Sequence, residues 1–126
     1  MYFLKGRTNR ATYAVGLAVS VALATVAIVL NVKIPGEVLL AFVCAPRLHD
    51  LGMSAWWFAF AILGEIAVVA AFAVNGAIDY AALPGIGMLL IPAIALLFIP
   101  GQPDANRFGD RPAPGISWGR APGPAT

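Results

Sequence analysis

Residues 47–57 read Arg-Leu-His-Asp-Leu-Gly-Met-Ser-Ala-Trp-Trp and form a polar break between two apolar stretches. Arg47, His49 and Asp50 place three charged or titratable side chains within four positions of a chain that is only 11% charged. The two tryptophans that follow are typical of the interface between membrane and water. This break therefore predicts the point where one membrane helix ends and the next one begins.

The composition of the whole chain predicts that its segments lie in lipid rather than in water. The chain has 126 residues, of which 60% are hydrophobic, whereas soluble domains have roughly 45–50% apolar and about 25% charged residues. This length allows one small domain. Cys44, the one cysteine, lies inside an apolar run, and we interpret it as a small buried hydrophobic side chain rather than a disulfide or metal ligand.

The chain contains four apolar segments, two before the polar break and two after it. Residues 11–32, 56–74 and 82–99 are each close to the 20 residues that a helix needs to cross a bilayer, and the first is too long for a removable signal. Residues 35–49 would make a helix of only about 22 Å, which either thins the bilayer or re-enters it from one side. The sequence therefore predicts an all-α, polytopic membrane protein with four transmembrane helices, of which the second is short or re-entrant.

The basic residues predict the orientation of these helices. If all four segments cross, the N-terminal Lys5, Arg7 and Arg10 share one side with Arg47 and with the arginines of the C-terminal region. Basic residues concentrate on the cytoplasmic side of membrane proteins, so both termini are expected in the cytoplasm. If the second segment only re-enters, the two basic termini lie on opposite faces.

The composition changes after the last apolar segment. We expect residues 1–112 to form one membrane-embedded helical domain and residues 113–126 to form a Pro/Gly-rich cytoplasmic tail. Such a tail has too little apolar content to order alone, so contact with a partner would have to order it. Trp118 is the expected docking residue and Arg120 the expected polar contact.

Small residues recur on the first segment at the four-residue spacing that lets membrane helices approach each other. One stripe comprises Gly16, Ser20 and Ala24. A second stripe, with the same spacing, comprises Ala14, Ala18 and Ala22. Either stripe could face a neighbouring helix.

Three polar motifs, taken in their order along the chain, resemble a known family. They are Gly-Arg-x-x-Arg (6–10), Arg-Leu-His-Asp-x-Gly-x-Ser-x-Trp-Trp (47–57), and Pro-Gly (100–101) followed by Asn-Arg-Phe-Gly (106–109). Together they resemble the small bacterial inner-membrane proteins of domain-of-unknown-function family 805, over residues 3–112. Pro46 stands where that family typically has the first of two arginines. The resemblance implies a location in the bacterial inner (plasma) membrane and implies no activity.

The polar motifs suggest two kinds of site. Asp50 can accept a bidentate pair from Arg7, Arg10 or Arg107, which would make a network that locks the helix ends. The same side chains could instead bind anionic lipid headgroups or a protein partner. The candidate binding residues are Arg7, Arg10, Arg47, His49, Asp50, Asn106 and Arg107.

The inventory of reactive residues argues against an enzyme. A single histidine cannot supply a two-histidine metal or haem site, and no Gly-rich phosphate loop follows a strand pattern. Ser54 lies near His49, but a serine just before a helix is more often its N-cap than a nucleophile. We therefore expect no cofactor, no catalytic residue and no nucleic-acid partner.

Glu65 is the remaining candidate, because it falls in the middle of the third apolar segment. An acidic residue inside a membrane is a functional-site hypothesis by default, and proton or cation coupling would be its sharpest form. The alternative is a protonated carboxyl group that hydrogen-bonds to Ser20, to Thr25 or to a partner chain.

Two functions follow from these observations. The first is a small non-catalytic accessory or scaffold subunit, whose partners are anionic lipids and a larger membrane-protein complex or further copies of itself. The alternative is a small oligomeric transporter or channel, coupled to ions or protons through Glu65.

Overall fold

The computed structural model describes residues 6–32 and 36–117, and in those ranges the protein is all-helical, with no β-strand. The elements in chain order are α1 (Arg10–Val29), α2 (Gly36–Asp50), α3 (Trp56–Val74), the short 3₁₀-helix η2 (Ile78–Tyr80) and α4 (Ala82–Phe98). These bounds agree with the four predicted apolar segments to within three residues. The prediction of an all-α chain is confirmed.

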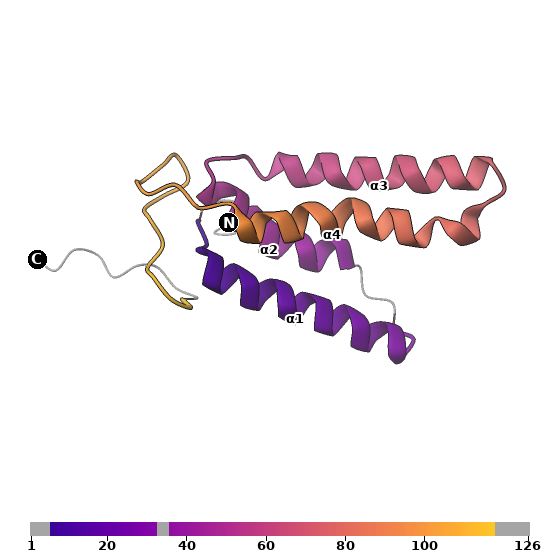
Figure 1. The fold of residues 1–126 in the computed structure, drawn as a ribbon, viewed down its shortest axis with the longest axis horizontal. Helices are drawn as coiled ribbons and strands as arrows, with labels where there is room; N and C mark the ends of the chain where they lie inside the picture. Colours follow the sequence, from indigo (N-terminus) through magenta and orange to yellow (C-terminus); the bar gives the residue numbers. More distant parts are fainter. Residues whose placement is uncertain (1–5, 33–35, 118–126) are drawn as a thin grey trace, which may run out of the picture.

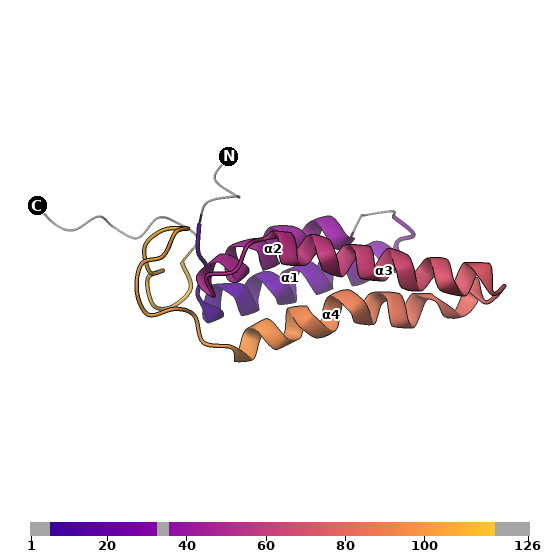
Figure 2. The same cartoon turned by 90° about the horizontal axis from the view of Figure 1, so that it is seen from above.

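The four helices lie side by side and alternate in direction (Figures 1 and 2). α3 packs against α4, α1 packs against α2, and α2 joins the two pairs by contacting both α3 and α4. The segment before α1, the loop between α2 and α3 and the segment after α4 meet at one end of the bundle (Figure 1). We call this end, formed by residues 6–10, 46–56 and 99–117, the polar end.

Three helical stretches are long and apolar enough to cross a membrane, namely α1, α3 and residues 78–98. They are the basis for describing the chain as a multi-pass membrane protein. α2 has 15 residues, which at 1.5 Å per residue is about 22 Å. The structure therefore supports the prediction that the second segment is the short one, and α2 still runs antiparallel to α1 along the bundle (Figure 1).

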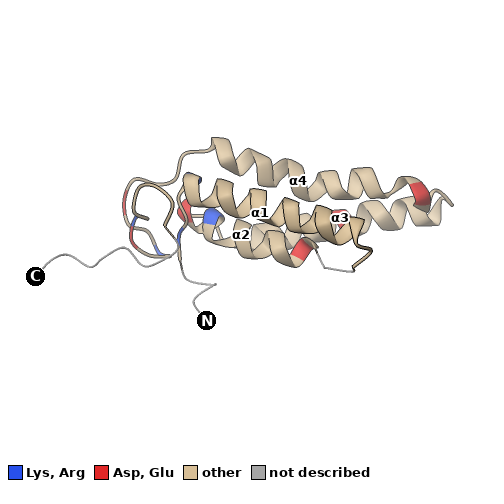
Figure 3. Ribbon diagram, turned by 90° about the horizontal axis from the view of Figure 1, so that it is seen from below, with Lys and Arg blue, Asp and Glu red and all other residues tan. Residues whose placement is uncertain are grey.

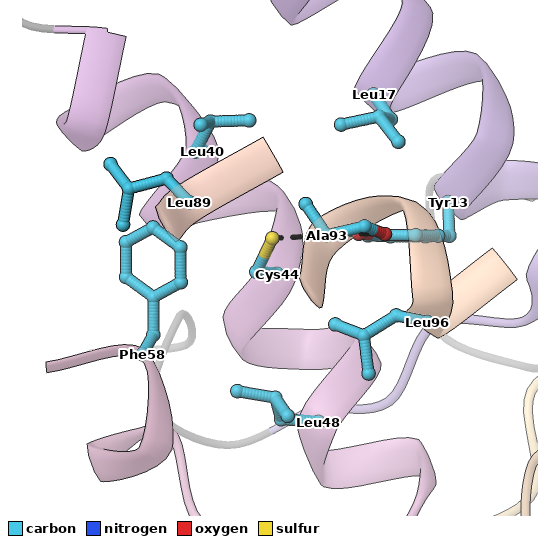
Figure 4. Close-up of a cluster of buried hydrophobic side chains, with 9 residues drawn as sticks. All are labelled: Tyr13, Leu17, Leu40, Cys44, Leu48, Phe58, Leu89, Ala93 and Leu96. Atoms are coloured by element: carbon cyan, nitrogen blue, oxygen red, sulfur yellow. Dashed lines mark hydrogen bonds between the residues drawn. The ribbon is translucent and has the colours of Figure 1, made fainter. Parts of the chain in front are cut away.

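The core lies where α1, α2 and α4 meet, with Phe58 closing it from the start of α3 (Figure 4). Tyr13 is fully buried, and its hydroxyl donates a hydrogen bond to the Ala93 carbonyl oxygen at 2.7 Å. The same hydroxyl lies 3.5 Å from the sulfur of Cys44, which is 1% exposed. The interpretation of Cys44 as a small buried side chain is thus confirmed.

The small-residue stripes on α1 have different environments. Gly16 and Ser20 are buried in the bundle, whereas Ala14 and Ala18 are exposed. The Gly16 stripe is therefore the face that packs against the other helices of this chain. Close approach at small residues gives the van der Waals contact that holds membrane helices together.

The first three helices end in the same way. After each helix the chain turns through a residue with positive φ, at Asn31 (53°), Gly52 (75°) and Gly76 (69°). After α2, the backbone N–H of Gly52 donates to the His49 carbonyl, and that of Met53 donates to the Leu48 carbonyl. This pair of bonds is a Schellman motif, which satisfies the last carbonyls of a helix. It explains why α2 stops at the polar break.

Candidate functional site

Asp50 is the centre of the polar end. Arg7 Nε donates to Asp50 Oδ1 at 3.0 Å, and Arg47 Nη1 donates to Asp50 Oδ2 at 2.5 Å. The three side chains are only 1%, 0% and 4% exposed for Arg7, Arg47 and Asp50. The predicted ion pair between Asp50 and an arginine of the N-terminal motif is therefore confirmed, and Arg47 is a second partner that was not predicted.

Arg47 also caps a neighbouring helix. Its Nε donates to the Leu96 carbonyl oxygen at 3.2 Å, and its Nη2 donates to the Ile99 carbonyl oxygen at 2.5 Å. The last carbonyls of a helix have no partner within the helix and carry the negative end of its dipole. The guanidinium of Arg47 thus satisfies the end of α4 while it neutralises Asp50.

Arg7 holds the segment that leaves α4. Its Nη2 donates to the Gln102 carbonyl oxygen and its Nη1 to the Asp104 carbonyl oxygen, each at 2.5 Å. The backbone N–H of Gln102 in turn donates to the Asp50 carbonyl oxygen at 2.9 Å. A Cβ atom added at Gly101 would overlap the carboxylate of Asp50. Gly101 is therefore needed for this close approach.

The Asn-Arg-Phe-Gly motif folds into a tight turn over His49. The backbones of Asn106 and Gly109 exchange two hydrogen bonds of 3.0 Å, and Phe108 stacks on the His49 ring with 4.0 Å between ring centroids. Asn106 Nδ2 donates to the His49 carbonyl oxygen at 2.8 Å. His49 Nδ1 lies 3.0 Å from the Gly6 carbonyl oxygen, so this nitrogen carries the donated proton.

All three sequence motifs are thus in contact at one end of the bundle. Arg7, Arg47, His49, Asp50 and Asn106 form one connected set of hydrogen bonds with the backbone segments around them. Arg107 lies over the Phe108 ring at 4.6 Å and stays exposed. Arg10 is exposed at the start of α1 and makes no ion pair with a carboxylate in the described ranges.

The first part of the C-terminal tail binds to the chain's own first helix. Asn9 Nδ2 donates to the carbonyl oxygens of Ala113 and Gly115, at 2.5 and 2.7 Å. The Ser117 backbone N–H donates to the Thr12 hydroxyl at 2.9 Å. The expectation that a partner must order this tail is therefore wrong for residues 113–117. Trp118 and Arg120, the predicted docking residues, lie outside the described residues.

Two further expectations need correction. Ser20 and Thr25 belong to α1, which does not pack against α3, and their hydroxyls donate to the Gly16 and Val21 carbonyls of their own helix. The expected hydrogen bond between either hydroxyl and the Glu65 carboxyl group is therefore not formed within the described part of this chain. The carboxyl group of Glu65 lies instead beside Gly85 of α4, because α3 packs on α4 and not on α1.

Ser54 is the predicted N-cap of α3, but it lies one residue before the cap position. Its hydroxyl accepts a hydrogen bond from the Trp56 backbone N–H at 3.4 Å, and α3 begins at Trp56 with Ala55 in the cap position.

At the polar end, buried polar side chains use their hydrogen bonds to hold neighbouring segments together, and we call this arrangement the clamp. Within the described ranges, every buried side-chain nitrogen and oxygen has a hydrogen-bond partner. In the same ranges, no group of three or more His, Cys, Asp or Glu residues could hold a metal ion. Charge-assisted bonds of this kind are short and strong, and here they join α2, the segment before α1 and the segment after α4.

A protein-family model described as "Protein of unknown function (DUF805)" matches residues 36–110, which is more than half of the chain. The chain belongs to the DUF805 family. The matched region begins with α2 and ends just after the Asn-Arg-Phe-Gly turn, so it includes Arg47, His49, Asp50 and Asn106 but not Arg7. No curated protein and no solved structure gives a significant match.

Sequence reasoning missed Arg47 as a partner of Asp50, and it missed Asn9 and Thr12. The first had a detectable signal, because residues three apart on a helix face each other. The contacts of Asn9 and Thr12 join residues that are more than 100 positions apart in sequence, and no local pattern marks them.

Proposed function

We propose that this DUF805 protein is a non-catalytic accessory or scaffold subunit of the bacterial inner membrane, and that its polar end is a rigid docking surface in the cytoplasm. The observation that carries this proposal is Asp50, which Arg7 and Arg47 share in a buried position. The ion pairs join the segment before α1 to α2, and the same two guanidinium groups donate to carbonyl oxygens at and beyond the end of α4. Three separate stretches of the chain are thereby held together, as a surface that presents a fixed shape to a partner requires.

The state of the polar groups favours a structural role over a catalytic one. A general base or nucleophile must be within hydrogen-bond reach of a substrate. The carboxylate of Asp50 already accepts bonds from two guanidinium groups and is 4% exposed. His49 is 2% exposed, and Phe108 covers its ring.

The charge distribution supports a cytoplasmic polar end. The five described arginines all belong to this end, whereas Glu37 begins α2 and Asp79 lies in η2 near the opposite end (Figure 3). An excess of arginine and lysine marks the cytoplasmic side of a membrane protein. With α2 as a short fourth crossing, both ends of the chain are cytoplasmic.

Photo-crosslinking in intact cells tests the docking surface. A photoreactive residue at Asp104, which is exposed at the polar end, should give a discrete and reproducible cross-linked band with one partner or with a second copy of the chain. The matched control is the same residue at Asp79, which is also exposed but lies at the opposite end. Equal bands from both positions, or none from Asp104, would contradict the proposal.

The second candidate function is an oligomeric carrier of protons or ions that uses Glu65. The observation in its favour is that this half-buried carboxyl group lies in the middle of α3, beside Gly85 of α4. Substitution Glu65→Gln discriminates between the two functions. An accessory subunit keeps its partner with Gln at this position, whereas a proton carrier loses transport because the amide cannot take up a proton.

A further inference from the structure

An open pocket of about 740 Å³ lies at the polar end, between the start of α1, the segment that leaves α4 and residues 111–115. Its charged lining consists of Arg10, Arg47, Arg111 and Asp50. Three arginines against one aspartate give the lining a net charge of +2. A volume of this size falls within the range of about 300–1,000 Å³ that is typical of small-molecule sites.

Two of these arginines have their charge available for a ligand. The guanidinium of Arg47 donates to Asp50 and to backbone carbonyls, so it is already satisfied. Arg10 and Arg111 are exposed, and neither forms an ion pair with a carboxylate of the described chain. The pocket therefore carries positive charge that no described carboxylate neutralises.

Two exposed tryptophans lie at the same end of the bundle as the pocket. Trp56 and Trp57 begin α3 at the same end of the bundle, and their side chains are 73% and 58% exposed. Exposed tryptophans at a helix end mark the membrane interface. Ala11, Pro100 and Pro112 add apolar atoms to the pocket wall, which suits the glycerol and first methylene groups attached to a headgroup phosphate.

We propose that this pocket binds a phosphate-bearing anion through Arg10 and Arg111, either the headgroup of an anionic phospholipid or a free phosphate. The planar guanidinium group matches the oxygens of a phosphate with two parallel hydrogen bonds. This inference rests on the proposed function only for placing the polar end at a membrane surface. Its test measures lipid binding, whereas the test of the proposed function measures a cross-link at Asp104. Either result can therefore be negative while the other is positive.

The test uses the full chain in a neutral detergent and native mass spectrometry to count bound ligands. The probes are dioctanoyl phosphatidylglycerol, dioctanoyl phosphatidylcholine and inorganic phosphate. The variants are Arg10→Gln and Arg111→Gln, singly and together, with Arg107→Gln as the control. Arg107 is also exposed at the polar end but does not line the pocket, so it matches the change in charge without touching the site.

We expect phosphatidylglycerol to bind the wild-type chain at least about tenfold more tightly than the double variant, since each arginine near an anionic surface contributes about 1 kcal/mol. The Arg107→Gln chain should bind as the wild type does. Weak competition by inorganic phosphate would identify the lipid headgroup as the ligand, and strong competition would identify free phosphate.

Equal loss in Arg107→Gln and in the double variant would overturn the proposal, because binding would then follow net charge alone. Equal binding of phosphatidylcholine and phosphatidylglycerol would also overturn it. Both arginines are exposed, so folding should be unaffected. If the double variant nevertheless misfolds, the two single variants carry the same test, each with a smaller expected loss of about fivefold.

Discussion

At the scale of single residues, the polar end depends on how one carboxylate and two guanidinium groups are buried together. Burying an ion costs several kcal/mol, and a pair recovers this cost only when its remaining hydrogen bonds are made. Arg7 and Arg47 use theirs on carbonyls at and beyond the end of α4. The second positive charge is therefore compensated by helix-end carbonyls rather than by a second acid.

Substitution Asp50→Asn should destabilise the folded protein by about 3–5 kcal/mol, because it leaves two buried guanidinium groups without a counter-ion. The amide keeps the shape of the carboxylate, so lost packing does not contribute. Thermal and SDS unfolding of the purified chain in detergent measure the change, and the yield of folded protein in membranes should fall with it.

The control for this substitution is Asp104→Asn. Asp104 is exposed, and only its backbone carbonyl bonds to Arg7, so the change should stay within about 0.5 kcal/mol. If Asp50→Asn proves as mild as the control, the ion pairs contribute little and the clamp does not hold the three segments together.

At the scale of elements, the helices are defined by how they end. α2 closes with Gly52 at a φ of +75°, and this turn points the chain toward α3 while the side chain of Gln102 packs over it. A residue with a Cβ atom tolerates this backbone region poorly. The glycine of the central motif is thus a requirement of the turn and not of the chemistry beside it.

Substitution Gly52→Ala should cost about 1–3 kcal/mol, because alanine is strained at positive φ and its Cβ atom would meet the side chain of Gln102. Gly36→Ala is the matched control. Gly36 begins α2 without positive φ, and an added Cβ atom there would meet nothing within 4 Å. That variant should be neutral or up to about 1 kcal/mol more stable. Unfolding curves of the two variants should therefore shift in different directions or by clearly different amounts.

The same elements show what a sequence can predict here and what it cannot. The bounds of α3 follow directly from the apolar run between the tryptophans and Asn75. The spacing of small residues on α1 predicted two possible packing stripes and did not show which of them is buried. The arrangement of the helices does not follow. Arg47 reaches carbonyls of α4 that lie 49 and 52 positions further along the chain, and that contact depends on which helices pack together.

At the scale of the whole molecule, the bundle contains three helical stretches that are long enough to span a bilayer and one that is not. α1, α3 and residues 78–98 each have about the length that the hydrocarbon core requires, but α2 is shorter. A helix that is too short thins the bilayer or draws polar flanking residues toward it. Arg47 and Asp50 lie in the last turn of α2. Because the two charges are paired with each other, the free-energy cost of placing them close to the lipid is lower.

The orientation of the chain follows from the same geometry. Because α2 runs back to the polar end (Figure 1), a full crossing by α2 brings the segment after α4 to the same side as the segment before α1. The basic residues at the polar end predict that this side faces the cytoplasm. Reporter fusions at Thr126 and within the α3–α4 turn at Asp79 should therefore give opposite signals, cytoplasmic at Thr126 and periplasmic at Asp79. A cytoplasmic reporter such as a fluorescent protein and a periplasmic one such as alkaline phosphatase should agree at each position. A periplasmic signal at Thr126 would show that α2 enters and leaves on one face, and Arg7 of the first motif could then not pair with Asp50.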